Sequence, residues 1–125
     1  MEQLDDRAME AVAMFFSAFA VPMRLRILNA LRHGERNVGE LTAELGGSQA
    51  NVSKHLATLA RIGVIAKRTS GTSAYYRIVD PRIFQLCDLV CVQVGNRLEQ
   101  EVVTRDALLR SVAPGPSGKR RAARR

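Results

Sequence analysis

Residues 48–63 read SQANVSKHLATLARIG, a short helical pattern whose two faces differ in chemistry. Val52, Leu56 and Leu59 recur at i, i+4 and i+7, so in a helix they share one apolar stripe. The opposite side carries small and basic residues, among them Lys54. The pattern therefore predicts an amphipathic helix that buries its apolar stripe and leaves a basic side open to solvent.

A second short helical pattern, residues 38–45, lies directly upstream and ends in Gly46 and Gly47. Two short helices joined by a glycine-containing turn are typical of a helix-turn-helix. In that motif the second helix enters the major groove of DNA, which is wide enough for one α-helix. We therefore expect residues 48–63 to be a recognition helix and the chain to bind DNA sequence-specifically.

The net charge of +7 is concentrated in two stretches of the chain. Between residues 54 and 82, six lysines and arginines stand against the single acid Asp80, and five more basic residues lie in the last seven positions. Clustered positive charge is the electrostatic signature of a polyanionic partner. A solvated basic face would give the same composition, so the coincidence with the helix-turn-helix is what favours DNA.

The length of the chain fits one folded domain, which we place at residues 1–112. No stretch approaches the roughly 20 apolar residues that span a bilayer. The first residues, MEQLDDR, are acidic where a signal peptide is basic. These features predict a cytoplasmic protein with no membrane partner. Residues 113–125 lack apolar periodicity, so we expect a disordered basic tail that either adds non-specific DNA affinity or only improves solubility.

Further elements are expected on both sides of the helix-turn-helix. The spacing of apolar residues predicts a helix over residues 4–20 and another over 23–32, with Pro22 at its start. Downstream, residues 64–68 and 74–79 are rich in β-branched and aromatic side chains and flank a polar, glycine-containing turn, which predicts a β-hairpin. A hairpin directly after the recognition helix is the wing of a winged helix-turn-helix.

The last helix is expected to run from residue 82 to about 109, with Asp80 as its N-cap and Pro81 at its first position. Its apolar stripe is too long for so small a domain to bury, so we expect it to pack against the same helix of a second subunit. The predicted fold is mainly α with a β-hairpin wing, in the order four helices, two strands and a final helix. We expect a homodimer held together through the terminal helices.

Three stretches give the chain a resemblance to a known family. They are AVPMRLRILNAL at residues 20–31, VGELTAELGGSQANVSKHLATLARIGVI at 38–65 and KRTSGTSAYYRI at 67–78. With these motifs the chain resembles the ArsR/SmtB family of bacterial winged-helix repressors. The resemblance implies a homodimeric transcriptional repressor that occupies an inverted-repeat operator in double-stranded DNA and leaves it on binding an inducer.

The resemblance also implies which residues meet the DNA. The start of the recognition helix approaches base edges, and Gln49 is the best candidate for direct readout because its amide can donate to and accept from adenine. Lys54 and the wing contact the DNA backbone, which fixes the register without reading sequence. The implied DNA-binding residues are Ser48, Gln49, Ala50, Asn51, Ser53, Lys54, His55, Arg61, Lys67, Arg68, Thr69, Ser70, Thr72 and Tyr75.

Several of these positions also have an ordinary structural interpretation. Ser48 is a natural helix N-cap, Val52 belongs to the apolar stripe, and His55 is either a phosphate contact or a partly buried, hydrogen-bonded residue. The wing residues would look the same in a solvated turn. Strand alternation turns one of Tyr75 and Tyr76 inward, and we assign Tyr76 to the core.

The two metal sites common in the family are not retained. Residues 40–45 read ELTAEL, with no soft ligand, and the last helix keeps Asp88 but contains no histidine. Cys87 and Cys91 lie one helical turn apart and leave three alternatives open. They are structural apolar residues, a thiol sensor of oxidation or persulfide, or ligands of a thiophilic ion. The inducer is accordingly expected to be a thiol-reactive compound or another small molecule.

The alternative function is a winged-helix module for protein–protein contact without operator specificity. The basic recognition face argues against it, because such a module has no need of positive charge there. An enzyme is not expected, since the sequence shows no Ser/His/Asp arrangement, glycine-rich phosphate loop or paired catalytic carboxylates. No cofactor is expected either.

Overall fold

The computed structural model of the protein describes residues 3–112. The chain divides into two units, Met1–Pro81 and Arg82–Arg125. The basic tail expected at residues 113–125 lies outside the described residues. The expected domain boundary at residue 112 therefore stays a prediction.

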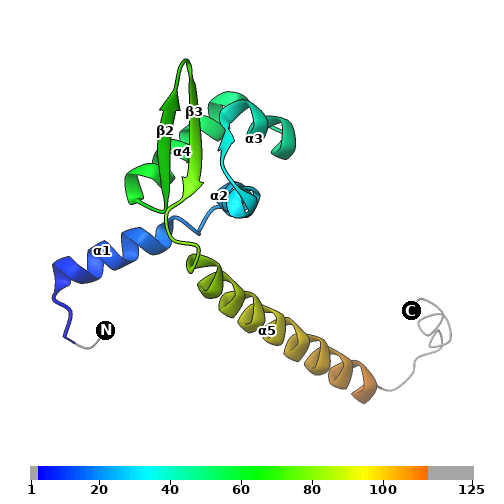
Figure 1. Ribbon diagram of the computed structural model, residues 1–125. Helices are drawn as coiled ribbons and strands as arrows, with labels where there is room; N and C mark the ends of the chain where they lie inside the picture. The colour runs from blue at the N-terminus through cyan, green and yellow to red at the C-terminus, as the bar shows by residue number, and fades with distance from the viewer. Residues whose placement is uncertain (1–2, 113–125) are drawn as a thin grey trace. The chain divides into compact units, whose positions relative to one another are not determined.

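The first unit combines short helices with a small sheet (Figure 1). In chain order its elements are α1 (Asp6–Ser17), α2 (Pro22–Ala30), the 3₁₀ helix η1 (Leu31–His33), β1 (Arg36–Asn37), α3 (Val38–Leu45), α4 (Gln49–Ile62), β2 (Ile65–Ser70) and β3 (Ser73–Ile78). α3 and α4 are the two helices of the helix-turn-helix and lie where the sequence predicts them. The winged helix-turn-helix is confirmed, with β1 as a strand that the sequence analysis does not predict.

The ends of α4 are set by its own sequence. The Ser48 hydroxyl accepts a hydrogen bond from the Asn51 N–H at 3.0 Å, which makes Ser48 the N-cap. At the other end Gly63 has φ 102° in the left-handed region, and its N–H donates to the Leu59 carbonyl at 3.0 Å. A side chain at Gly63 would be strained there. The predicted span of the recognition helix is thus confirmed.

The apolar stripe of α4 lies at the centre of the core. Val52, Leu56 and Leu59 are each 0% exposed, as are Ile27 of α2 and Leu41 of α3. The three helices contact one another. Truncating a buried leucine to alanine typically costs about 2–5 kcal/mol. This packing therefore fixes the rotation of α4 about its own axis.

α3 begins with a capping box at the end of β1. The Asn37 side chain accepts from the Glu40 N–H at 2.8 Å, and the Glu40 carboxylate accepts from the Asn37 N–H at 2.9 Å. Gly46 and Gly47, both with positive φ, then turn the chain into α4. The sharp turn between the two helices therefore has a glycine where the backbone requires one.

The wing is a three-stranded antiparallel sheet in the order β1-β3-β2. Residues pair from Ile65 with Ile78 to Ser70 with Ser73, so only two residues, Gly71 and Thr72, form the turn. The turn predicted at residues 69–73 is therefore too long. Its outer residues have their backbone groups in the strand ladder, which is more favourable than leaving them in a loop. Gly71, with φ 62°, supplies the conformation that a tight hairpin turn needs.

β1 adds a third strand along the free edge of β3. Arg36 pairs with Tyr76, and Asn37 pairs with Tyr75. With two residues, β1 is too short to show the alternation by which strands are recognised in a sequence. It connects the helical part of the unit to the wing through backbone hydrogen bonds.

Among the described residues, His55 is the one polar residue that is buried. Only 8% of its surface is exposed. Its Nδ1 accepts a hydrogen bond from the Arg24 Nε–H at 3.3 Å, and Arg24 also donates to the Ser17 carbonyl at 3.0 Å. The contact joins α4 to α2 and to the end of α1. The pKa of His55 is lowered from 6.5, mainly because burial disfavours the charged ring and also because Arg24 and Lys54 repel it.

α1 contributes no buried residue to the unit. It begins at Asp5, whose carboxylate accepts from the Ala8 N–H at 2.8 Å, and it ends at Ser17, so it is shorter than the predicted 4–20. Met14 is 56% exposed and Phe16 is 51% exposed. α1 thus presents apolar side chains to solvent in the isolated chain.

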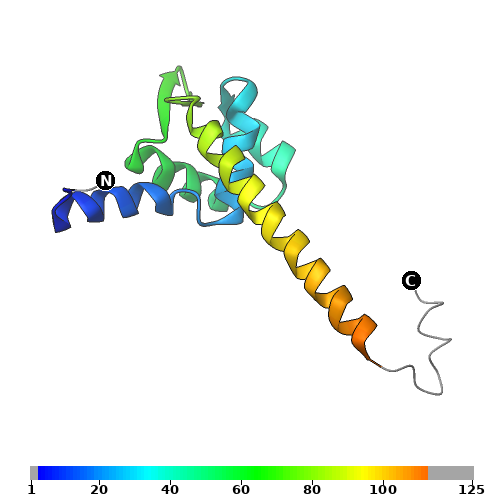
Figure 2. The same ribbon diagram turned by 90° about the horizontal axis from the view of Figure 1, so that it is seen from below.

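The second unit is the single helix α5 (Ile83–Ser111), 29 residues long and unbroken in Figures 1 and 2. The predicted N-cap, Asp80, is wrong by two residues, because the N-cap is Arg82. The reason is local, because the first turn closes through the Gln85 N–H and the Arg82 carbonyl at 3.0 Å, which leaves Asp80 and Pro81 before the helix.

Most apolar residues of α5 are open to solvent in the single chain. Ile83 and Phe84 are the buried residues of this helix. The large apolar residues at least 48% exposed are Leu89, Val90, Val92, Val94, Leu98, Val102, Val103, Leu108 and Leu109. Within residues 3–112, no single helix has the length and apolar composition to span a membrane; one pair, Asp6–Ser17 with Pro22–His33, meets the criterion only when joined across a 73° bend.

The neutral state of His55 predicts a pH dependence of stability. The unfolded chain protonates this histidine near pH 6.5, whereas the folded chain resists protonation because its pKa is lower. The free energy of unfolding should therefore fall as the pH drops below about 6.5, and His55 should have no such effect well above that pH. Urea denaturation between about pH 8 and 5 measures this.

His55→Gln, which carries no titratable ring, should show a weaker pH dependence than the wild type across this range. The exposed His33 offers a matched control variant, His33→Gln, which replaces an imidazole outside the core. Equal pH dependence in His55→Gln and the wild type would show that the buried ring does not couple protonation to folding.

Candidate nucleic-acid interface

The predicted DNA-binding residues of α4 differ in exposure. Gln49, Ala50, Lys54 and Arg61 are exposed, Asn51 and Ser53 are half-buried, and Val52 and His55 are buried. Ala50, Lys54 and Arg61 lie opposite the apolar stripe, as the helical spacing predicts, whereas Gln49, three residues before Val52, is exposed at the start of the helix. The first turn of α4 therefore offers its side chains to a partner outside the unit.

Three of the alternatives left open by the sequence now have a structural answer. The Ser48 hydroxyl is engaged as the N-cap, and Val52 is fully buried in the core. His55 is not on the open face, because its ring is buried and hydrogen-bonded to Arg24. Val52 and His55 therefore support the core, whereas Ser48 caps α4 and stays exposed, so its contact with DNA stays a prediction.

The wing residues lie on both faces of the sheet and at its tip. Lys67, Arg68, Thr69, Ser70 and Thr72 are exposed. Tyr76 is 8% exposed, which confirms its assignment to the core. Tyr75 is half-buried and pairs with Arg68 across the strands.

One hollow brings the start of α4 and the tip of the wing together. It has a volume of about 390 Å³ and is lined by Asn37, Val38, Gly39, Gln49, Thr72, Ser73 and Ala74. Two residues predicted separately, one from the recognition helix and one from the wing, thus face the same space. The start of α3, with Val38 and Gly39, completes its wall, and these residues were not among the predicted site residues.

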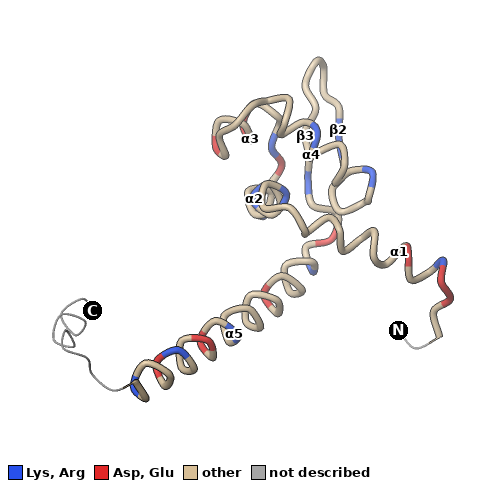
Figure 3. Tube along the Cα trace, turned by 180° about the vertical axis from the view of Figure 1, so that it is seen from behind, with Lys and Arg blue, Asp and Glu red and all other residues tan. Residues whose placement is uncertain are grey.

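Arg61 lies away from this hollow. It is twelve residues beyond Gln49 on the same helix, or about 18 Å along the axis at 1.5 Å per residue. The structure therefore does not bring all the predicted cations to one point. Figure 3 shows Lys and Arg positions on the hairpin and on α4, whereas α3 carries only acidic charges, those of Glu40 and Glu44.

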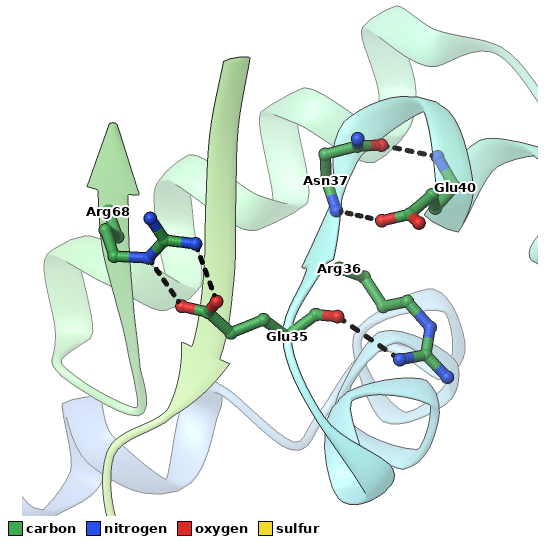
Figure 4. Close-up of polar contacts among 5 residues, drawn as sticks. All are labelled: Glu35, Arg36, Asn37, Glu40 and Arg68. Carbon is green, nitrogen blue, oxygen red and sulfur yellow. Dashed lines mark hydrogen bonds and ion pairs between the residues drawn. The ribbon is translucent and has the colours of Figure 1, made fainter. Parts of the chain in front are cut away.

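Arg68 is paired within the chain. Its Nε–H donates to Glu35 Oε2 at 3.0 Å, and its Nη2–H donates to Glu35 Oε1 at 2.8 Å (Figure 4). The guanidinium carbon also lies 5.0 Å from the centre of the Tyr75 ring. Glu35 was not a candidate from the sequence, because it lies 33 residues before Arg68 and outside the recognition helix and hairpin.

The pair stays charged near neutral pH. The pKa of Glu35 is lowered from 4.5, mainly because Arg68 donates hydrogen bonds to the carboxylate. Desolvation opposes this shift, while the positive charges of Arg68 and Arg77 add to it. The pKa of Arg68 is raised by the same hydrogen bonds.

The two cysteines lie on α5. Cys87 is partly exposed and Cys91 is exposed. Within the part of the chain that the structure describes, no group of three or more His, Cys, Asp or Glu side chains is placed to hold a metal ion. Any role of the thiols in sensing therefore stays a prediction.

Comparison with known proteins identifies a family. Residues 22–67 match the family model described as "Bacterial regulatory protein, arsR family". The chain is 35% identical over 97 residues to a probable mercury resistance operon repressor of Streptomyces lividans, covering 77% of this chain and 78% of that one. It is 36% identical over 85 residues to the transcriptional regulator NmtR of Mycobacterium tuberculosis, covering 68% of this chain and 71% of that one.

Solved structures show the same likeness. The crystal structure of Rv0081 from M. tuberculosis has a TM-score of 0.69 and 33% identity, and the match covers 78% of this chain and 99% of that one. The homodimeric winged helix-turn-helix DNA-binding domain Mb0332 from Mycobacterium bovis, solved by NMR, has a TM-score of 0.65 and 33% identity, with coverages of 80% and 95%. The chain therefore belongs to the arsR family of bacterial regulatory proteins and is a DNA-binding transcriptional regulator with a winged helix-turn-helix fold.

Proposed function

We propose that this regulator is a homodimeric repressor that binds an inverted-repeat operator through α4 and the wing, and leaves it when an inducer binds. The observation that carries the proposal is the hollow shared by Gln49 of α4 and Thr72 of the wing. A recognition helix and a wing that face the same side can meet one duplex together. Such a protein acts in the cytoplasm, where bacterial DNA lies.

Sequence reading falls to the first turn of α4. Gln49 and Ala50 are exposed there, and a glutamine amide pairs with an adenine edge through two hydrogen bonds, while an alanine methyl contacts the methyl of thymine. Asn51 and Ser53 are half-buried and lie beside them. Because Val52 is fully buried, base readout is assigned to its exposed neighbours.

Backbone contacts fall to the exposed cations and hydroxyl groups. Lys54 and Arg61 lie on the open side of α4, and Lys67, Thr69, Ser70 and Thr72 lie on the wing. Lysine and arginine bind phosphate through charge, and hydroxyl groups bind it through hydrogen bonds. These contacts supply affinity that depends on salt, because neutralised phosphates release counterions.

Dimerisation through the terminal helices accounts for the exposed apolar residues. Val94 is 52% exposed and Leu98 is 55% exposed on α5, and α1 exposes Met14 and Phe16. Exposed apolar area of this extent marks an interaction surface. The M. bovis domain that this chain resembles is homodimeric. Two-fold symmetry would place two copies of α4 about one helical turn of DNA apart.

The cysteines of α5 are the residues through which a thiol-reactive inducer would act. Cys91 is exposed and Cys87 lies one turn away on the same helix face. Thiolates bind thiophilic ions and react with oxidants only where they are accessible. One relative is named a probable repressor of a mercury resistance operon. We infer a thiol-reactive inducer ahead of another small molecule.

Substitutions in α4 should separate sequence reading from backbone contact. Gln49→Ala should relax base preference at one operator position by about 1–3 kcal/mol, because it removes a two-bond contact to a base edge. Lys54→Ala should weaken binding to all duplexes. The slope of log K against log salt concentration should become shallower by about 0.9 per protomer, because one phosphate contact is lost. Fluorescence anisotropy with the duplex upstream of the chain's own gene, and with a scrambled duplex, measures both.

The two variants control for each other, since both residues are exposed on one helix and neither supports the core. If the wild type binds neither duplex at moderate salt, the proposed function is wrong. If Lys54→Ala keeps the wild-type salt slope, Lys54 does not contact phosphate.

Charges placed on α5 should break the dimer. Val94→Glu combined with Leu98→Glu puts carboxylates on the exposed apolar surface of α5. Dimerisation would bury these carboxylates without a cationic partner, which is unfavourable. We expect a monomer by analytical ultracentrifugation and weaker binding to the upstream duplex. Gln93→Glu, a like charge at an exposed polar position of the same helix, should leave the dimer intact. A wild type that is already monomeric at assay concentrations would contradict the proposal.

A further inference from the structure

Glu35 reaches across the wing sheet to Arg68. It directly precedes β1, whereas Arg68 lies on β2, and β3 runs between these two strands. Tyr75 of β3 pairs with Arg68 on one side and with Asn37 on the other. The side-chain pair therefore spans the three strands (Figure 4). The guanidinium of Arg68 also lies over the ring of Tyr75 on β3.

The pairing has a consequence for charge. Two parallel N–H···O bonds between arginine and a carboxylate are among the stronger and more directional side-chain contacts. Side-chain exposure is 52% for Arg68 and 32% for Glu35, so the pair lies at the surface where the wing would meet DNA. A duplex phosphate approaching Arg68 meets a pair with no net charge. Lys67, the neighbouring residue on β2, is exposed and keeps its charge open to a phosphate.

We propose that Glu35 determines DNA specificity by neutralising Arg68, which lowers the sequence-independent affinity of the wing while leaving base readout by α4 in place. The inference rests on the proposed function, in which the wing contacts the DNA backbone. Non-specific affinity comes from cations that neutralise phosphates and release counterions. A cation that is already paired with a carboxylate contributes little to this non-specific affinity. The ratio of operator affinity to non-specific affinity is therefore higher than it would be with an unpaired Arg68.

The test measures anisotropy titrations of the full chain at several salt concentrations, on the upstream duplex and on a scrambled duplex. Glu35→Gln leaves an amide of nearly the same shape but frees the charge of Arg68. We expect tighter binding to the scrambled duplex, a salt slope steeper by about 0.9 per protomer, and a lower ratio of specific to non-specific affinity. The double variant Glu35→Gln with Arg68→Ala removes both charges and should return to the wild-type slope on the scrambled duplex.

Glu44→Gln is the matched control. Glu44 also pairs with an arginine, Arg36, but through a single contact of 3.8 Å outside β2. Glu44→Gln removes the same unit of negative charge as Glu35→Gln. We expect it to change the salt slope of DNA binding much less than Glu35→Gln does. Thermal unfolding of each variant, followed by circular dichroism, confirms that the chain is folded during the titrations.

Two results would overturn the inference while the wild type still binds its operator. The first is an equal effect of Glu44→Gln and Glu35→Gln, which would mean that only the total charge matters. The second is a double variant whose slope falls below that of the wild type by about 0.9 per protomer, which would mean that Arg68 itself contacts phosphate in the wild type. Failure of the wild type to bind any duplex would remove the proposed function and this inference together.

Discussion

The burial of one face of α4 is the constraint on which the rest of the molecule depends. Val52, Leu56 and Leu59 have no exposed surface, and burying side chains of this size stabilises the fold by roughly 1.5–3 kcal/mol each. A helix held by three such residues cannot rotate without exposing them. The direction of the opposite face, with Ala50 and Lys54, and the position of Gln49 in the first turn are therefore fixed by this packing.

The polar contacts around this core join neighbouring elements and do not drive its formation. Arg24 connects His55 of α4 to the end of α1, and Glu35 connects β1 to Arg68 of the wing. Surface ion pairs contribute little to stability. The first contact holds the buried His55 against α2, and the second engages the charge of Arg68 on β2.

Local sequence signals predicted the recognition helix well and the long-range contacts poorly. The ends of α4 depend on Ser48 and Gly63, which act on backbone groups within four residues, so the sequence contains the whole cause. The start of α5 was placed two residues too early, with Asp80 as N-cap, because the first turn closes at Arg82. The contact between Glu35 and Arg68 could not be predicted, since it depends on the register of three strands that only folding brings together.

The central claim, that the first turn of α4 and the tip of the wing meet DNA together, is tested most directly by NMR of the ¹⁵N-labelled chain with the duplex upstream of its gene. We expect the backbone amides of residues 48–54 and 70–73 to shift on titration, while those in the middle of α5 change little. Shifts confined to α5 or α1, with residues 48–54 unchanged at saturating duplex, would contradict the account.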